Sequence, residues 1–446
     1  MEKTEPWWSS QKINTERLIF YLVLLFLPTQ FGRHFWPSFA FIYGIRVDYL
    51  SPTLYITDLL IITLFLFFTV PKLKKKKILK NLQNIMKIPS SYKFFLLFLL
   101  ITVVGIILSK NPFAGWYGFI KLLEFIFFGF YISVFINKTR FKTALTLFSI
   151  SVIYESVLSI AQFVNRGSLG GFFYLFGERA FSSQTPGIAN ASLNGELVLR
   201  PYSTFSHPNV LAGFLLIGMT LLIYNIDLIT SRLKKILIYT ALFLGTASLF
   251  LTMSRTAILL WLLVIAALGV RKIKNNLKQK NLHLYLIIIG LLMLGIFFTP
   301  IGSRFMNINF SDEVFILRME LVKNSIETIM KNPLFGTGIN NYLVDLPSVW
   351  MTKYSMLYLQ PAHNIFLLVA VQLGIPGFLL FLIFLKKTFE NIIYNKHLKI
   401  FNLKLTLLTL VFVLGLFDHY LLTLQQGQLL FSFVLGICWS KKLKLS

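Results

Sequence analysis

The chain has 446 residues, of which 56% are hydrophobic and 13% are charged, and its mean hydropathy is +0.71. This balance excludes a soluble globular domain and predicts a protein whose main solvent is the lipid bilayer. The net charge of +26 would suit nucleic acid, but the lysines and arginines recur in short segments after every second apolar run. Cytoplasmic loops of membrane proteins have that distribution, so we expect no nucleic-acid partner.

In chain order, about twelve apolar runs are long enough to cross roughly 30 Å of hydrocarbon, the first, second, eighth and last of them being short. We therefore predict an all-α polytopic membrane protein with about twelve transmembrane helices. The runs lie near residues 18–30, 54–70, 92–109, 116–137, 142–164, 208–226, 236–253, 256–270, 284–300, 364–385, 400–417 and 427–440.

The connectors between these runs differ in charge. Residues 72–87 and 271–280 are rich in cations and contain no acid, and further basic segments lie at residues 138–142, 232–235, 386–399 and 441–444. All of them fall on one side if the N-terminus is cytoplasmic. The sequence therefore predicts a multi-pass protein of the cytoplasmic membrane with both termini in the cytoplasm.

We expect one integrated membrane domain in three parts. Residues 1–300 hold helices one to nine with short loops, residues 301–363 form a large extracytoplasmic loop, and residues 364–446 hold the last three helices. Within the loop, apolar residues recur at helical spacing between Ser311 and Lys331, which predicts an amphipathic helix on the membrane surface. Gly336 and Gly338 then mark a turn that needs unusual backbone angles.

Several arginines lie at helix mouths on the predicted outer face, against the usual charge bias. Arg200 precedes Pro208, which suits the first turn of the sixth helix, with Ser206 or His207 near its cap. The free N–H groups of that helix end and the planar guanidinium would together favour an anion such as phosphate. The alternative is a capped helix whose arginine reaches the lipid headgroups.

Three further residues on this face have a functional and a structural interpretation. Arg255 forms a tight outer turn and is either an anion ligand or an exposed turn residue. Lys121 lies near the outer end of the fourth run, where it either pairs with Glu124 or reaches the same anion. His363, just before an apolar run, is either a general base, the usual role of histidine near neutral pH, or an interfacial anchor.

The order of these motifs resembles the O-antigen ligase/O-antigen polymerase superfamily of bacterial multi-span membrane glycosyltransferases. The motifs are Arg200 with His207-Pro-Asn209, Thr252-x-Ser-Arg255, Arg318 followed by Asn332-Pro-Leu-Phe-Gly-Thr-Gly338, and His363-Asn364 before an apolar helix. Gly374-Ile-Pro-Gly377 also fits, although the Glu often found shortly before this Gly is Gln372 here.

This resemblance implies metal-independent, inverting transfer of a glycan from a polyprenyl (undecaprenyl) pyrophosphate carrier to an acceptor hydroxyl on the extracytoplasmic face. The acceptor would be a glycolipid, a glycan or a protein, and no cofactor is implied. By position, Arg200 and Arg318 would bind the pyrophosphate, with Arg255 and Lys121 as further cations, and His363 would be the general base. The residues that would shape the site are His207, Asn209, Gly336, Gly338 and Asn364.

Two alternatives remain open at this point. A polymerase that joins carrier-linked repeat units would share this scaffold and these motifs. A transporter or flippase of a lipid-linked anion belongs to a different class and should place polar residues near the bilayer midplane. Glu155 and Gln162 are the few residues of that kind here.

Overall fold

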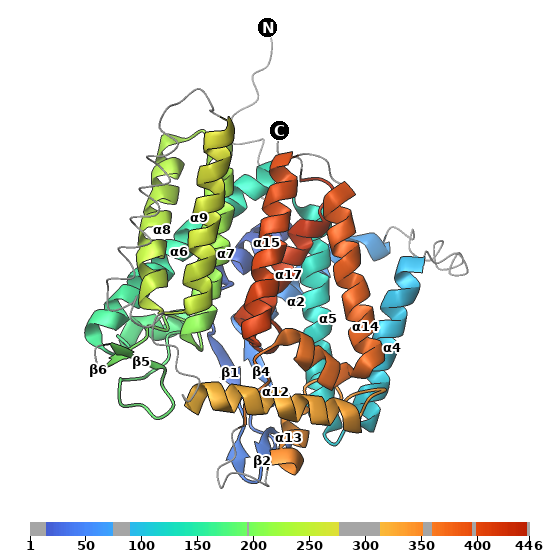
Figure 1. The fold of residues 1–446 in the computed structure, drawn as a ribbon. Coiled ribbons are helices and arrows are strands. Elements are labelled where there is room, and N and C mark those ends of the chain that lie inside the picture. Colours follow the sequence, from blue (N-terminus) through green and yellow to red (C-terminus); the bar gives the residue numbers. More distant parts are fainter. Residues whose placement is uncertain are drawn as a thin grey trace.

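The computed structural model describes residues 15–74, 90–193, 196–275, 313–350, 359–394 and 398–443, and most of them are helical (Figure 1). The predicted run at 284–300 and parts of the basic connectors and of the large loop lie outside these residues. The long helices of the bundle are α1 (Thr15–Phe26), α2 (Ile56–Lys74), α4 (Ser90–Leu108), α5 (Pro112–Phe135), α6 (Lys138–Asn165), α7 (Pro208–Asn225), α8 (Arg232–Leu251), α9 (Arg255–Asn275), α14 (Ile365–Tyr394), α15 (Leu398–Phe417) and α17 (Gln425–Trp439).

Among the described residues, six helices are long and apolar enough to cross a membrane, namely α5, α6, α7 with the following η4 (Ile226–Leu228), α8, α14 and α15. Shorter apolar stretches lie in α2, α4 and α9. The polytopic helical class predicted from the sequence is thus supported, whereas the full set of about twelve spans and the three-part division of the chain stay predictions.

Side chains just before the helices fix where several of them begin. The Asn111 side chain accepts a hydrogen bond from the N–H of Ala114 at the start of α5, and Asn137 does the same for Arg140 in α6. His207 caps α7 through the N–H of Asn209, and Pro208 occupies the first turn as predicted. These caps satisfy N–H groups that a helix start leaves unpaired.

Helix α7 lies at the centre of the bundle, where almost all of its side chains are buried. Its neighbours are α6, α8, α9, α15 and α17, and α17 also packs closely on α5. Gly213 and Gly427 allow the short helix α16 (Tyr420–Thr423) to approach, because a side chain at either position would overlap Tyr420. Close packing thus connects the start of α7 with the turn between α15 and α17.

Helix α12 (Glu313–Lys331) crosses one end of the bundle, which we call the α12 end (Figure 1). Its protein-facing side buries Leu321, Ser325 and Thr328, whereas the apolar side chains of Met319 and Ile326 stay exposed. An exposed apolar stripe suits a helix on a membrane surface, as predicted. The short helix α13 (Tyr342–Trp350) follows at the same end.

The sequence did not predict the three small antiparallel strand pairs outside the bundle. Strand β1 (Gly32–His34) pairs with β4 (Thr53–Tyr55), and Gly32 lies opposite Tyr55. Between them, after the 3-10 turn η1 (Ser38–Ala40), lies the hairpin of β2 (Phe41–Ile42) and β3 (Ile45–Arg46). Strands β5 (Asn190–Leu193) and β6 (Glu196–Leu199) follow a second 3-10 segment, η3 (Gly171–Phe176), and lead to Arg200.

The turn at Gly336 and Gly338 packs onto a break in α14. At Gly374 the helix has a φ of +67°, so the backbone around it cannot make regular helical hydrogen bonds. The N–H of Thr337 donates to Val371 O at 2.8 Å, and that of Gly338 donates to Gln372 O at 3.1 Å. The turn therefore satisfies carbonyl groups that the break leaves free.

Candidate active site

A cavity of about 1350 Å³ opens among α4, α5, α14, α17 and the loops of the α12 end. Its polar part is lined by His207, His363, Asp418 and His419, together with Lys121. Its apolar part follows the bundle helices and is lined by Phe94 and Phe98 of α4, Phe125 and Phe130 of α5, Phe384 of α14 and Trp439 of α17. One cavity thus joins a group of ionisable side chains to a long hydrophobic wall.

His363 lies in the turn before α14. The neighbouring Asn364 caps this helix, because its Oδ1 accepts hydrogen bonds from the N–H groups of Phe366 and Leu367 at 2.9 and 3.0 Å. Its Nδ2 donates to the carbonyl of Leu416 at 3.2 Å, which ties the turn to the end of α15. Asn364 therefore shapes the site by fixing the backbone beside the histidine.

The His363 ring lies between a carboxylate and an amide. Its Nδ1 is 3.6 Å from Asp418 Oδ1, and its Nε2 is 3.3 Å from the side-chain amide of Gln360. Asp418 follows the last residue of α15, so both groups lie outside the apolar helices. A carboxylate beside one ring nitrogen orients the imidazole and favours a proton on that side, which leaves the other nitrogen as a base.

Asp418 stays ionised even though it is buried. Burial alone would raise the pKa of its carboxyl group, but the adjacent imidazole of His363 and the other neighbouring imidazoles hold this pKa well below its usual range. Its Oδ2 accepts a hydrogen bond from Asn209 Nδ2 at 2.9 Å, which fixes the carboxylate against the start of α7.

Two further histidines surround this pair and remain neutral near pH 7. Burial and the charge of Arg200 lower the pKa of His207 to about 3. Burial also lowers the pKa of His419 to about 3, with His363 and Arg318 adding to the effect and Asp418 opposing it. The His419 and His363 rings are 4.9 Å apart, so His419 packs beside the candidate base.

Arg200 joins this cluster through Asn209. Its Nε donates to Thr252 O at 2.7 Å, and its terminal NH2 donates to Asn209 Oδ1 at 2.6 Å. The same Asn209 side chain donates to Asp418, so an unbroken chain of contacts runs from Arg200 to the carboxylate beside His363. Arg200 is buried, and its hydrogen bonds are therefore electrostatically stronger than those of a surface arginine.

The mid-span polar residues noted in the sequence hold the loop that carries Arg200. Glu155 accepts hydrogen bonds from the hydroxyls of Ser203 and Thr204, and the Oε1 of Gln162 accepts from the N–H of Ser203 at 2.6 Å. Both acceptors are completely buried in α6. Their role in the fold is to satisfy the backbone and hydroxyl groups of residues 202–204.

Arg255 and Arg318 each have a buried Nε atom with no hydrogen-bond partner among the described residues. Arg255 starts α9 shortly after Thr252, whose carbonyl accepts from Arg200. Arg318 lies in α12, and its charge is felt at His419. A buried guanidinium N–H without an acceptor is energetically unfavourable, so these atoms indicate where an anionic ligand would be stabilised.

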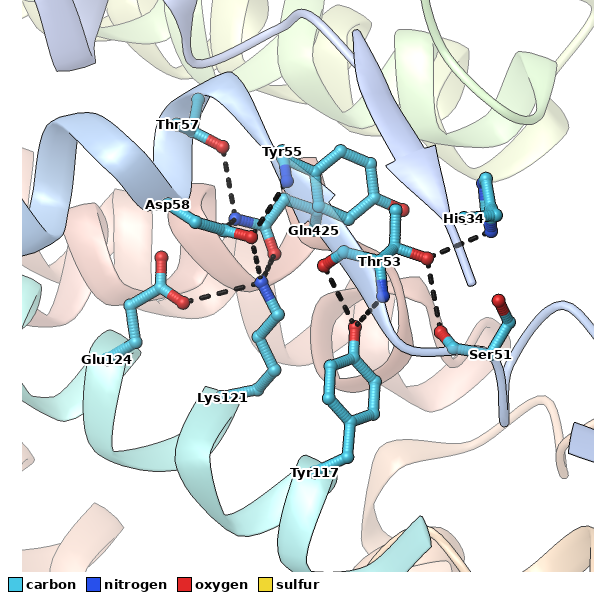
Figure 2. A network of polar contacts seen from close by, with 10 residues as sticks. All are labelled: His34, Ser51, Thr53, Tyr55, Thr57, Asp58, Tyr117, Lys121, Glu124 and Gln425. Atoms are coloured by element: carbon cyan, nitrogen blue, oxygen red, sulfur yellow. Dashed lines mark hydrogen bonds and ion pairs between the residues drawn. The ribbon is translucent and has the colours of Figure 1, made fainter. Parts of the chain in front are cut away.

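Lys121 lies in a separate polar network of the same cavity (Figure 2). Its Nζ is 2.5 Å from Asp58 Oδ2 at the start of α2 and 3.4 Å from Glu124 Oε2, and it donates to Gln425 Oε1 at 3.2 Å. Two carboxylates already balance its charge. The pairing with Glu124 considered from the sequence is present, and a role in pyrophosphate binding stays a prediction.

Gly336 and Gly338 do not line the cavity, but the following Ile339 and Asn340 do. The two glycines can therefore shape the site only indirectly, through their packing on the break in α14. Of the predicted residues, the structure brings together Arg200, His207, Asn209, His363 and Asn364. Arg200, Arg255 and Arg318 are not among the residues that line the cavity.

The site predicted from the sequence did not include Asp418 and His419. The sequence pattern that could have identified them is an acid next to a histidine in a short turn between two apolar runs. Charged groups in such a position are unfavourable unless they have a function or a partner. One ligand atom from each of His363, Asp418 and His419 lies within 4.8 Å of the other two, and this donor set, within the described part of the chain, could hold a cation. Metal-independent chemistry therefore stays a prediction.

The fold and this site define a helical polytopic membrane protein with an ionisable centre at one end of its bundle. Residues 240–382 match the family model described as O-Antigen ligase, which confirms the resemblance to the O-antigen ligase superfamily. The match includes Arg255, Arg318, Gly336, Gly338 and His363, whereas Arg200 and Asp418 lie outside it. No curated protein matches the chain.

Proposed function

We propose that the protein transfers a glycan from a polyprenyl pyrophosphate carrier to an acceptor hydroxyl at the extracytoplasmic face of the bacterial cytoplasmic membrane, without a metal ion. The observation that carries this proposal is the pair of His363 and Asp418 at the polar end of an apolar cavity, connected through Asn209 to Arg200. Arg255 and Arg318, each with a buried Nε that lacks a partner among the described residues, would supply further positive charge. A base and an anion site next to a hydrophobic wall suit a lipid-linked pyrophosphate donor.

In the proposed reaction the acceptor oxygen attacks the anomeric carbon of the donor sugar. The hydroxyl proton passes to Nε2 of His363, while Asp418 stabilises the imidazolium through Nδ1. The bond between the anomeric carbon and the pyrophosphate oxygen breaks, and its electron pair stays on the pyrophosphate. Arg200, Arg255 and Arg318 stabilise the charge that develops on this leaving group. Displacement from the opposite face inverts the anomeric centre.

The apolar part of the cavity supports a polyprenyl carrier in particular. Its aromatic and aliphatic lining extends from the histidine cluster to Phe384 of α14 and Trp439 of α17, so a hydrocarbon chain would lie along the bundle while its pyrophosphate stayed at the α12 end. Each methylene of the carrier that the cavity removes from water would contribute about 0.8 kcal/mol to binding. This geometry supports a mechanism in which the reacting bond lies beside His363.

The test is transfer by the purified protein in liposomes that contain an undecaprenyl-pyrophosphate-linked oligosaccharide and a candidate acceptor. We expect His363→Ala to abolish transfer while carrier binding is kept, because the base is lost and the arginines remain. Arg318→Lys should slow transfer about 10²–10³-fold, since lysine cannot reproduce the guanidinium contacts. Arg166→Gln, an exposed arginine at the end of α6 outside the cavity, is the matched control.

Product size separates the ligase from the polymerase alternative in the same assay. One transferred glycan for each acceptor supports ligation, whereas a ladder of carrier-linked products supports polymerisation. Full activity of His363→Ala would reject the proposed base.

A further inference from the structure

The outer rim of the cavity is built by the segment that contains β1 to β4. Trp36, Arg46 and Tyr49 of this segment line the cavity, and Arg179 lines it from the loop between η3 and β5. Figure 1 shows β1, β2 and β4 gathered at the α12 end. These four residues, which we call the rim, have no part in the proposed chemistry of His363.

Aromatic contacts hold the rim residues in place and connect them to His419 and His363. The Arg46 guanidinium lies 3.8 Å above the Trp36 ring, and the His34 ring stacks on Trp36 at 5.7 Å. The Tyr49 ring packs edge-on against His419 at 5.6 Å, and His419 in turn contacts His363. A stacked guanidinium keeps its in-plane N–H groups free for a second partner.

The rim also carries positive charge that the described residues do not neutralise. Neither Arg46 nor Arg179 has an ion-pair partner within the described part of the chain. Glu178, next to Arg179, cannot serve, since its buried carboxylate accepts hydrogen bonds from Gln162 and from the N–H groups of Leu169 and Gly170. Asp48 is the acid that lines the cavity nearby, and it is exposed.

The pKa of His34 responds to both rim arginines, which indicates that both lie near the stacked rings of His34 and Trp36. Burial lowers the pKa of His34, Asp48 opposes the effect, and the charges of Arg179 and Arg46 lower the pKa further. Two arginines from separate segments of the chain therefore act on one imidazole that stacks on Trp36. Convergence of this kind concentrates positive potential at the mouth of a cavity.

We propose that the rim is a subsite for a negatively charged saccharide, a sugar that bears a carboxylate or a phosphate and is held next to His363. Arg46 and Arg179 would bind the anionic group through charge-assisted hydrogen bonds, and Trp36 and Tyr49 would contact the sugar ring. The inference rests on the proposed glycan transfer, and it specifies that one of the saccharides in the reaction is negatively charged. The saccharide belongs either to the donor glycan or to the acceptor.

Binding of a charged and a neutral form of one saccharide tests the subsite without any transfer reaction. The probes are trigalacturonate and its methyl ester, titrated calorimetrically against the protein in nanodiscs of zwitterionic lipid. We expect the wild type to bind trigalacturonate more tightly than the ester. Arg46→Gln and Arg179→Gln should each weaken trigalacturonate binding at least tenfold and leave the ester unaffected, and Arg166→Gln should change neither.

Several results would overturn the subsite. They are equal binding of both saccharides, binding of neither, or unchanged trigalacturonate binding in the two rim variants. An effect of the rim variants that follows anionic phospholipid in the nanodisc rather than the saccharide would assign the arginines to the membrane surface. Because binding is measured directly, failure of transfer in the separate assay leaves this result interpretable.

A transfer assay with the carboxylate placed on only one substrate identifies the source of the saccharide. If the loss in Arg46→Gln follows a carboxylate on the donor glycan, the rim holds the donor, and if it follows one on the acceptor, the rim holds the acceptor. An equal loss with two neutral substrates would contradict recognition of charge.

Discussion

Asp418 is the residue that links the two halves of the candidate site. One of its carboxylate oxygens faces His363 Nδ1 at 3.6 Å, and the other accepts a hydrogen bond from Asn209, which also accepts from Arg200. One buried carboxylate therefore connects the candidate base to Arg200 through Asn209. This arrangement fixes the imidazole relative to the predicted leaving group.

We expect Asp418→Asn to reduce the rate of transfer by about 10²–10⁴-fold, because the charge that orients and stabilises the His363 imidazolium is removed. Asparagine keeps an oxygen that can accept from Asn209, so the fold and carrier binding should be preserved. The measurement is the transfer rate at saturating donor, together with donor affinity and the thermal midpoint. Unchanged transfer would show that the carboxylate has no part in the reaction.

The sequence identified most single residues of the site but could not join them. Arg200, His207 and Asn209 are close in the chain, so a helix start next to a cation could be predicted there as a candidate anion site. The partner of Asn209 is Asp418, which is separated from it by 209 positions. Only the packing of α15 and α16 against the start of α7 brings these groups together, and no local pattern contains that information.

At the scale of elements, the break in α14 and the turn that packs on it form one structural unit. Gly336 has a φ of +66°, and a Cβ there would lie 2.3 Å from Val371 O. Gly374, on the helix side, would meet Leu334 O at 2.5 Å. Both positions therefore require glycine for conformation and for space. The unit fixes the break within α14, the helix that begins shortly after His363.

Gly336→Ala should destabilise the protein by about 1–3 kcal/mol beyond the effect of its backbone angle, because the new methyl group would overlap the backbone of α14. Gly187→Ala is the matched control, since Gly187 has a φ of +74° with nothing within 4 Å of a Cβ. The control should lose only about 1–2 kcal/mol, the cost of a left-handed backbone angle. Thermal midpoints compared with that of the wild type measure the difference.

Equal midpoints for the Gly336 and Gly187 variants would mean that the turn does not pack on α14 as described. The sequence indicated the long helices, because runs such as 116–137 and 142–164 are mostly apolar. It predicted the Gly336 turn but gave no indication that the turn satisfies a helix break. The strand pairs β1 to β6 were missed because each strand has two to four residues, too few for an alternating pattern to be recognised.

At the scale of the whole molecule, the charge pattern and the position of the site predict one orientation in the membrane. The loops next to the site lie at the α12 end, where the sequence placed the extracytoplasmic face. The start of α8 is basic, as a cytoplasmic segment should be. The orientation itself remains a proposal that a labelling experiment can decide.

In a Cys438→Ala background, we expect a membrane-impermeant maleimide to label Gln184→Cys in intact cells and to label Lys234→Cys only after the membrane is opened. Both native side chains are exposed, so access rather than burial controls the reaction. Labelling of Lys234→Cys from outside would reverse the orientation and place the site at the cytoplasmic face.

The most direct test of the central claim is whether this protein itself cleaves the carrier–glycan bond. The measurement is free undecaprenyl pyrophosphate and newly linked glycan, quantified together in proteoliposomes that contain wild-type protein, donor, acceptor and a chelator. The proposed mechanism predicts that the two products appear in equal amounts and that neither forms with His363→Ala. Movement of intact carrier-linked glycan across the membrane without release of the pyrophosphate would contradict it and identify a transporter.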